Sequence, residues 1–251
     1  MKNLVCLFFA FLFLISCASQ NANTKKDIEI AIATKRLGEV HYKDGKYTMA
    51  LKSLLEAQNI IPNNPELNNS LGLVYLAKKR YDLAQTHFQK ALALKPDFIR
   101  AKNNLGASYL KQKKWNLAIK CFEEVSENLL YANLEIPFSN LGWAYFHQKM
   151  YKKSKLYFRK ALDIRPNFLV AIHGLSMIYI ETRHPDQAIN FIRKVLKEKP
   201  NAAILHSDLA KAYEAIKDFS KAKKSWNAVI KFVPATSPLA KEAQKRLFEL
   251  N

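Results

Sequence analysis

The chain has 251 residues, of which 40 are basic and 21 are acidic, so its formal net charge at pH 7 is +19. Its three cysteines are too few for the disulfide framework of a small secreted scaffold, and the length is sufficient to bury a large core. Taken alone, so large a positive charge is typical of proteins that bind anionic partners, nucleic acid among them.

The N-terminus places a lysine before an apolar run that covers residues 4–15. This pattern predicts a secretory signal, because a membrane-spanning helix takes about 20 apolar residues. The sequence LISC at residues 14–17 resembles the lipobox of bacterial lipoproteins. The resemblance implies removal of residues 1–16, acylation of Cys17 with palmitate or a similar chain, and, since Ala18 is not aspartate, a lipid anchor on the periplasmic face of the outer membrane.

A short polar tether is expected to follow the lipidated cysteine, so residues 17–30 are predicted to be the lipidated N-terminus and tether. Cys6 leaves with the signal and Cys17 is blocked by lipid. Cys121 is then the only thiol, which excludes an intramolecular disulfide and means that packing must stabilise the fold.

A pattern with a period of 34 residues begins next. Leu71-Gly72, Tyr75, Ala84, Phe88 and Ala91 recur as Leu105-Gly106, Tyr109, Ala118, Phe122 and Val125. The pattern resembles the tetratricopeptide repeat, which implies an all-α fold: a right-handed superhelical solenoid of antiparallel helix pairs. Six repeats are predicted, at residues 31–64, 65–98, 99–134, 135–168, 169–202 and 203–236, with a C-terminal capping helix at 237–251.

The recurring residues have physical roles within each helix pair. Glycine at positions such as Gly72 and Gly142 lets two helices approach closely, and the proline that ends most repeats stops the second helix. The spacing from Gly106 to Gly142 is 36 residues, which predicts a longer link after the third repeat.

Motifs for catalysis or metal binding are missing from the sequence, which contains no CxxC, HExxH or GxSxG pattern and no glycine loop for phosphate. We therefore expect neither an enzyme nor a bound metal or cofactor. His173 lies on the first helix of the fifth repeat, where it either lines a binding site or is a solvated polar group. Cys121 is expected to be a small buried thiol.

The resemblance also implies that certain positions of each first helix face a concave groove. Those positions hold the apolar residues Leu73, Leu76, Leu110, Trp143, Phe146, Met177 and Ile180. Amides on the same helices, whose groups both donate and accept hydrogen bonds, are Asn69, Asn103, Asn104 and Asn140. We interpret these residues as a site for a protein partner; the alternative is that neighbouring hairpins cover them.

Many of the basic residues cluster where the first helix of a pair turns into the second. They are Lys78, Lys79, Arg80, Lys111, Lys113, Lys114, Lys149, Lys152 and Lys153. They form either a solvated edge or a contact with anionic lipid or cell-wall polymers. The predicted export signal argues against a nucleic-acid partner.

The whole layout, with the block from Ile136 to Tyr145 after the long link, resembles the outer-membrane lipoproteins of type IV pilus biogenesis called pilotins. The resemblance implies an adaptor that binds an outer-membrane secretin subunit and assists its localisation and assembly. Two alternatives stay open: a lipoprotein scaffold that recruits cell-wall hydrolases, and one that assists outer-membrane protein assembly.

Overall fold

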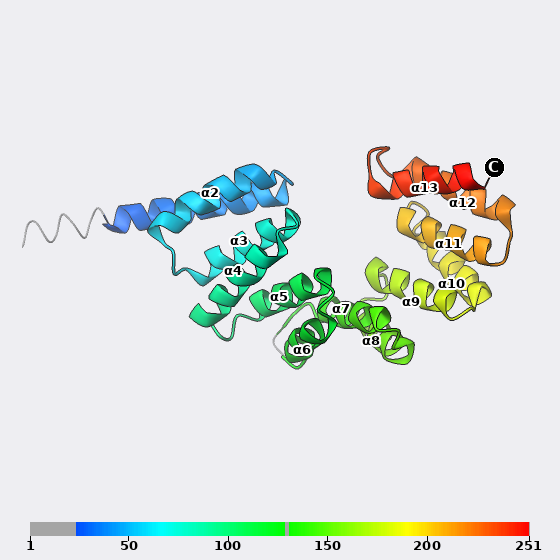
Figure 1. The fold of residues 1–251 in the computed structure, drawn as a ribbon, viewed down its shortest axis with the longest axis horizontal. Coiled ribbons are helices and arrows are strands. Elements are labelled where there is room, and N and C mark those ends of the chain that lie inside the picture. Colours follow the sequence, from blue (N-terminus) through cyan, green and yellow to red (C-terminus); the bar gives the residue numbers. More distant parts are fainter. Residues whose placement is uncertain (1–23, 129–130, 251) are drawn as a thin grey trace, which may run out of the picture. The chain divides into compact units, whose positions relative to one another are not determined.

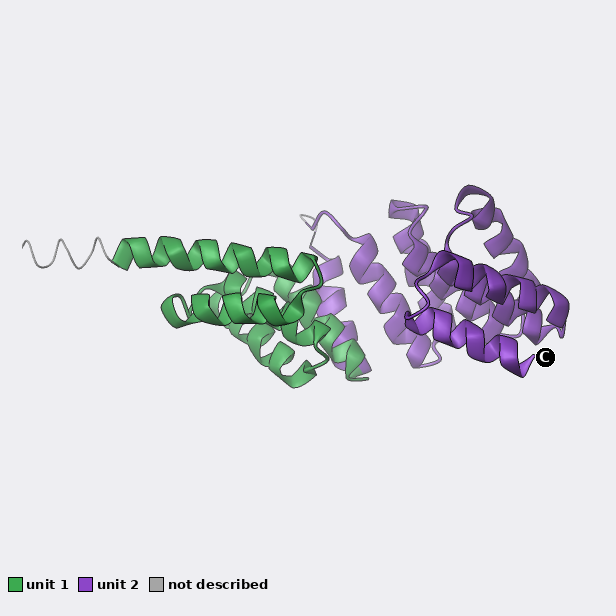
Figure 2. Ribbon diagram, turned by 90° about the horizontal axis from the view of Figure 1, so that it is seen from above, with its two compact units in different colours: residues 1–114 green, residues 115–251 purple. Residues whose placement is uncertain are grey.

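The computed structural model describes residues 24–128 and 131–250, and α-helix is the regular secondary structure in these two segments. The chain divides into two compact units, Met1–Lys114 (unit 1) and Trp115–Asn251 (unit 2), shown in different colours in Figure 2. Cys17 and the predicted signal peptide lie outside the described residues.

The described part of unit 1 begins with a helix over residues 24–43, so the segment expected to be a polar tether is helical from residue 24 onward. Residues 24–30 of this helix are exposed, and Ala31 is its first residue that is buried in the core of the first repeat. The helices that follow are α2 (Tyr47–Ile60), α3 (Pro65–Ala77), α4 (Tyr81–Leu94) and α5 (Ile99–Lys111) (Figure 1).

Unit 2 contains α6 (Trp115–Ser126), α7 (Glu135–His147), α8 (Tyr151–Ile164), α9 (Leu169–Glu181), α10 (Pro185–Glu198), α11 (Ala203–Ala215), α12 (Phe219–Phe232) and α13 (Pro238–Glu249). We call the first helix of each pair inner (24–43, α3, α5, α7, α9 and α11) and the second outer (α2, α4, α6, α8, α10 and α12). The predicted all-α repeat fold is confirmed, and the inner helices from α3 onward begin at residues 65, 99, 135, 169 and 203.

Local sequence determines where several helices start. Asn64 lies in extended backbone before α3, and its side-chain oxygen accepts a hydrogen bond from the backbone N–H of Leu67 at 2.7 Å. Ser237 caps α13 in the same way through Ala240 N–H at 3.1 Å. Proline follows each of these caps directly, where its missing N–H costs nothing.

Phe158 is the centre of one core in unit 2 and is fully buried. A Cβ placed on Gly142 would lie 2.6 Å from its ring, and one on Gly174 would lie 2.2 Å from it. The Phe158 ring therefore occupies space that α7 and α9 leave open because Gly142 and Gly174 have no side chains. Ser154, which replaces the usual alanine, donates a hydrogen bond to the Gly142 carbonyl at 2.8 Å and so satisfies its buried hydroxyl.

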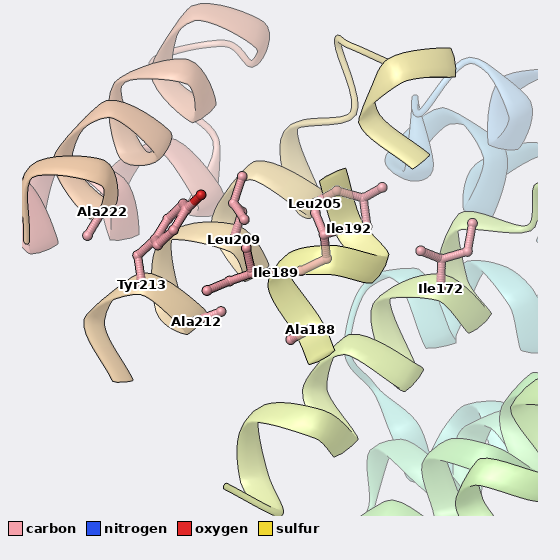
Figure 3. Close-up of a cluster of buried hydrophobic side chains, with 9 residues drawn as sticks. All are labelled: Ile172, Ala188, Ile189, Ile192, Leu205, Leu209, Ala212, Tyr213 and Ala222. Carbon is pink, nitrogen blue, oxygen red and sulfur yellow. The ribbon is translucent and has the colours of Figure 1, made fainter. Parts of the chain in front are cut away.

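A second core in unit 2 joins α9, α10, α11 and α12 (Figure 3). Its buried residues are Ile172, Ala188, Ile189, Ile192, Leu205, Leu209, Ala212, Tyr213 and Ala222. Beyond it, α13 covers Trp226 and Val229, which are fully buried. This terminal helix supplies the apolar cover that the last repeat of a solenoid lacks.

Unit 1 has an equivalent core in which Leu54, Leu67 and Leu71 are fully buried together with Ala50 and Val74. On the next outer helix, the ring of Phe88 lies where a Cβ on Gly72 would be 2.5 Å away. The two units therefore use the same device, an aromatic ring against a glycine backbone, to bring inner and outer helices together.

Candidate functional site

The inner helices of unit 1 line a pocket of about 310 Å³. Its walls are Glu39, Tyr42, Lys43, Leu54, Asn69, Ser70, Leu73 and Arg100, which come from the first helix and from α2, α3 and α5. Leu54, Leu73 and the Tyr42 ring make the lining partly apolar, while Lys43 and Arg100 are exposed cations at its margin. An apolar floor with a few polar groups at the rim is the usual character of a pocket that accepts a side chain.

Hydrogen bonds fix the polar side of this pocket. Ser70 donates to a carboxylate oxygen of Glu39 at 2.8 Å, and Lys35 lies 3.3 Å from the same carboxylate. The Asn104 amide donates to the side-chain oxygen of Asn69 at 2.9 Å. Asn69 therefore keeps its amide N–H groups for another acceptor, such as the backbone carbonyl of a bound peptide.

The structure places the remaining residues predicted for unit 1 at different depths. Leu73, Leu76 and Leu110 are half-buried, so they offer apolar surface without standing free in solvent. Asn103 is 8% exposed, and its side-chain oxygen is buried without a hydrogen-bond partner. Asn103 is thus a poor candidate for direct contact with a partner.

In unit 2 the aromatic residues predicted for the groove pack at the edge of the Phe158 core. The Trp143 ring meets Phe158 edge to face with centroids 5.4 Å apart, and Phe146 at 5.3 Å. Both Trp143 and Phe146 are half-buried and contact this core. The Trp143 ring therefore covers one side of Phe158 and contributes to this core as well as to the predicted groove face.

The other residues predicted for unit 2 are Asn140, Met177 and Ile180. All three are half-buried on α7 and α9, and Ile180 packs against the core of Figure 3. They continue the partly apolar face of the inner helices within this unit.

A histidine and an aspartate form a partly buried polar contact between two inner helices of unit 2. His173 Nδ1 lies 2.8 Å and 2.9 Å from the two carboxylate oxygens of Asp208, which is fully buried. Burial raises the pKa of the Asp208 carboxyl, and the contact with His173 acts in the opposite direction. The His173 ring also lies 5.1 Å from that of Trp143.

Sequence reasoning weighed His173 but did not find Asp208. Asn69 with Asn104 in unit 1 and His173 with Asp208 in unit 2 share a 35-residue spacing, but only the hydrogen bonds of the structure show that this interval brings the side chains together. In both units a polar side chain of one inner helix forms a hydrogen bond with a polar side chain at nearly the same position along the next inner helix. Neighbouring inner helices within a unit are therefore parallel and in register.

The two described segments lack both the clusters typical of metal sites and helices that are long and apolar enough to span a membrane. Nowhere in them do three histidine, cysteine or carboxylate side chains gather as metal ligands would. Their helices are all too short or too polar to cross a bilayer.

Comparison with known proteins identifies the repeats. A family model described as tetratricopeptide repeat matches residues 29–97, 63–127 and 97–167, and a second with the same description matches 145–207. The chain belongs to the tetratricopeptide repeat family. Such repeats typically serve as scaffolds that bind protein partners rather than as enzymes.

Among curated relatives, anaphase-promoting complex subunit 3 of Schizosaccharomyces pombe is 30% identical over 104 residues, which are 41% of this chain and 15% of that protein. The chain spans between 13% and 39% of the length of the curated relatives that it matches. These matches therefore concern the repeats and not the whole of those proteins.

Two solved structures share the fold over most of their length. The structure described as a functional characterisation of Pseudomonas aeruginosa PilF has a TM-score of 0.68 at 22% identity and covers 88% of this chain and 99% of its own. PilW, described as a widely conserved type IV pilus biogenesis factor, has a TM-score of 0.74 at 19% identity, with 86% and 98% covered. At these identities the likeness establishes a common fold.

Proposed function

We propose that this tetratricopeptide repeat protein is an outer-membrane lipoprotein adaptor, anchored through Cys17, that binds a segment of the type IV pilus secretin along its inner helices. In this role it assists the localisation and assembly of the secretin. The lipobox resemblance supports the anchor, and the fold shared with PilF and PilW supports a place in pilus biogenesis.

The unit 1 pocket is the observation that carries the binding role. Leu73 and Tyr42 can contact one apolar side chain of a peptide, and the free amide N–H groups of Asn69 can bond its backbone. Lys43 and Arg100 at the rim would attract an acidic residue next to that side chain. The pocket thus suits an extended segment that combines an apolar and an acidic residue.

Crosslinking in intact envelopes tests which protein occupies the pocket. A photo-reactive amino acid at Leu73 should crosslink to the secretin, whereas the same group at Thr86, exposed on the outer helix α4, should not. Capture of a cell-wall hydrolase, or of an outer-membrane assembly factor, at Leu73 in place of the secretin would contradict the proposed partner and identify one of the two alternatives.

A charge reversal tests the pocket without disturbing the core. Arg100→Glu changes an exposed side chain of the pocket, and Lys52→Glu makes the same change at an exposed position of α2 outside it. We expect Arg100→Glu to weaken secretin capture about tenfold or more while Lys52→Glu leaves it within about twofold. Equal loss in both variants would show that net charge, and not this pocket, governs capture.

A further inference from the structure

The turns that join inner to outer helices hold a cation in an unusual backbone conformation. In the described segments the non-glycine residues with positive φ are Lys79 (59°), Lys113 (59°), Lys149 (59°), Arg183 (60°) and Lys217 (62°). The corresponding turn of the first repeat uses Gly45, with φ of 74°. Glycine adopts this left-handed region freely, whereas a residue with a Cβ is strained there.

Local stability does not explain why a lysine or arginine occupies the left-handed position in all five turns. A cation after the end of a helix interacts favourably with the helix dipole, but one in the last helical turn would do so without the strained backbone. All five side chains are exposed, and none of them lies within 4.0 Å of a carboxylate of the described residues. The left-handed conformation itself ends each inner helix, because the N–H of the following residue donates to the carbonyl five residues earlier, as Arg80 does to Tyr75 at 2.8 Å. Glycine would adopt this conformation without strain, so the repeated choice of a cation points to a functional use of the side chain.

The helices bring these cations together within each unit. In unit 2 the inner helices α9 and α11 are parallel and in register, as the contact of His173 with Asp208 shows. The Trp143 ring of α7 contacts the His173 ring of α9 with an offset of about one helical turn. The C-terminal ends of the three helices therefore lie side by side, and the turns at Lys149, Arg183 and Lys217 form one edge of the unit.

Unit 1 repeats the arrangement with two turns. Lys79 and Arg80 from one turn and Lys114 from the next line a common pocket of about 490 Å³, which also contains Asp82. Successive turns are thus neighbours in space, and cations outnumber carboxylates between them. In unit 2 the carboxylate nearest in sequence to Lys217 is Asp218, which is already paired with Lys221 at 2.6 Å.

We propose that the turn cations of unit 2, Lys149, Arg183 and Lys217, form a docking edge for the anionic headgroups of a phospholipid surface. These three cations are exposed and recur once per repeat along the edge of unit 2, so they complement a laterally extended negative surface better than one small ligand. The edge does not involve the unit 1 pocket, so this inference stands apart from the partner proposed above.

The strained backbone itself supplies a clean test. Lys149→Gly, Arg183→Gly and Lys217→Gly in one chain remove three charges and replace each residue by the one that favours its φ. A matched control removes three exposed charges from the middle of the outer helices of unit 2, with Arg159→Gln, Lys194→Gln and Lys224→Gln. Residues 24–251 are suitable for both variants, because they contain every described helix and omit the apolar run that would itself bind lipid.

Sedimentation with vesicles of phosphatidylglycerol mixed into phosphatidylcholine, and with phosphatidylcholine alone, measures the binding. The parent chain should bind the anionic vesicles preferentially and lose binding as salt is added. Each basic residue near such a surface contributes about fivefold, so the glycine variant should lose on the order of 100-fold in partition coefficient and the control variant less than about tenfold. Inorganic phosphate at matched ionic strength should compete no better than chloride.

Two results would overturn the docking edge. Equal losses in the two variants would show that only total charge matters, and binding of the parent to polyglutamate but not to anionic vesicles would assign the edge to an acidic polypeptide. Thermal unfolding checks the premise, because the glycine variant should melt at or above the parent temperature. If it melts lower, a variant with asparagine at the three positions, a residue that tolerates the left-handed region, replaces it in the same vesicle comparison.

Discussion

At the scale of single residues, the fold depends on places where a side chain is missing. Gly142 and Gly174 lie against the same ring, that of Phe158, which has no exposed surface through which it could move aside. The period of the sequence accounts for Gly142, but Gly174 falls outside the repeat pattern and its role becomes clear only from its contact with Phe158. A residue that breaks a repeat pattern can therefore be as constrained as one that follows it.

Replacing Gly174 by alanine is expected to destabilise the protein. Alanine in a helix is about 1 kcal/mol more favourable than glycine, but overpacking a core costs about 1–3 kcal/mol. A Cβ placed 2.2 Å from a buried ring lies at the severe end of that range, so we expect a net loss of about 1–2 kcal/mol in urea denaturation. The double variant Gly174→Ala with Phe158→Leu should lose less than the sum of the two single changes, and additive losses would mean that the clash is absent.

Tyr145 gives the stability of unit 2 a dependence on alkaline pH. Burial, followed by the hydrogen bond that its hydroxyl donates to Glu123 at 3.0 Å, raises its pKa to about 12. The usual tyrosine value is 10.0, so the folded state favours the neutral phenol. The resulting stabilisation is complete below pH 10 and is lost as the pH rises from about 10 to 12.

We therefore expect Tyr145→Phe to be less stable than the parent protein at neutral pH and to approach it as the pH rises above about 10. Urea midpoints measured across that range for both proteins provide the comparison. Tyr81→Phe, at a half-buried tyrosine of unit 1, controls for the loss of a phenol group. A constant difference between Tyr145→Phe and the parent at every pH would contradict the raised pKa of Tyr145.

At the scale of helices, the sequence predicts where a helix begins more reliably than it predicts the contacts between helices. The cap at Asn64 and the proline after it define the first residue of α3 without reference to the rest of the chain. Pairs such as His173 with Asp208 depend instead on the register of two helices and on which rotamers reach across, neither of which one sequence reveals.

The cap at Asn64 can be tested against its neighbour. Asn64→Ala removes the acceptor of the Leu67 N–H and should cost about 1 kcal/mol of unfolding free energy. Asn63→Ala changes the adjacent exposed asparagine and should cost less than about 0.5 kcal/mol. If the two variants lost equal free energy of unfolding in chemical denaturation, the hydrogen bond from the Leu67 N–H to Asn64 would stabilise the protein no more than hydration of the same N–H does.

The predicted partner-binding residues also show that contacts between helices are harder to predict from the sequence than the positions of the helices. Repeat position correctly placed Leu73 and Trp143 on inner helices, but exposure depends on neighbouring side chains, so Asn103 is buried and Trp143 covers part of a core. Lys79, Lys113 and Lys149 belong to the basic clusters seen in the sequence, but the sequence analysis did not single out Arg183 and Lys217, and it did not predict the left-handed conformation of any of the five. Composition and period thus predict which face a residue is on, and packing decides how much of it a partner can reach.

At the scale of the whole molecule, the positive excess of +19 is the dominant electrostatic feature. Charges of one sign repel each other in the compact state, and that repulsion extends over a Debye length of about 30 Å at 0.01 M salt but only about 8 Å at 0.15 M. The opposing effect, weakening of exposed ion pairs such as that of Lys46 with Asp44, is small because such pairs contribute about 0–1 kcal/mol each.

Adding sodium chloride between about 0.01 and 0.15 M is therefore expected to raise the urea midpoint, because screening relieves more repulsion than it weakens attraction. The glycine variant at Lys149, Arg183 and Lys217 carries three fewer positive charges and should show a smaller rise. Potassium chloride should match sodium chloride, which separates screening from specific ion effects. A urea midpoint that falls with salt would mean that attraction within ion pairs outweighs the net repulsion between positive charges. Repulsion of the turn cations by the other positive charges would then not destabilise the folded protein.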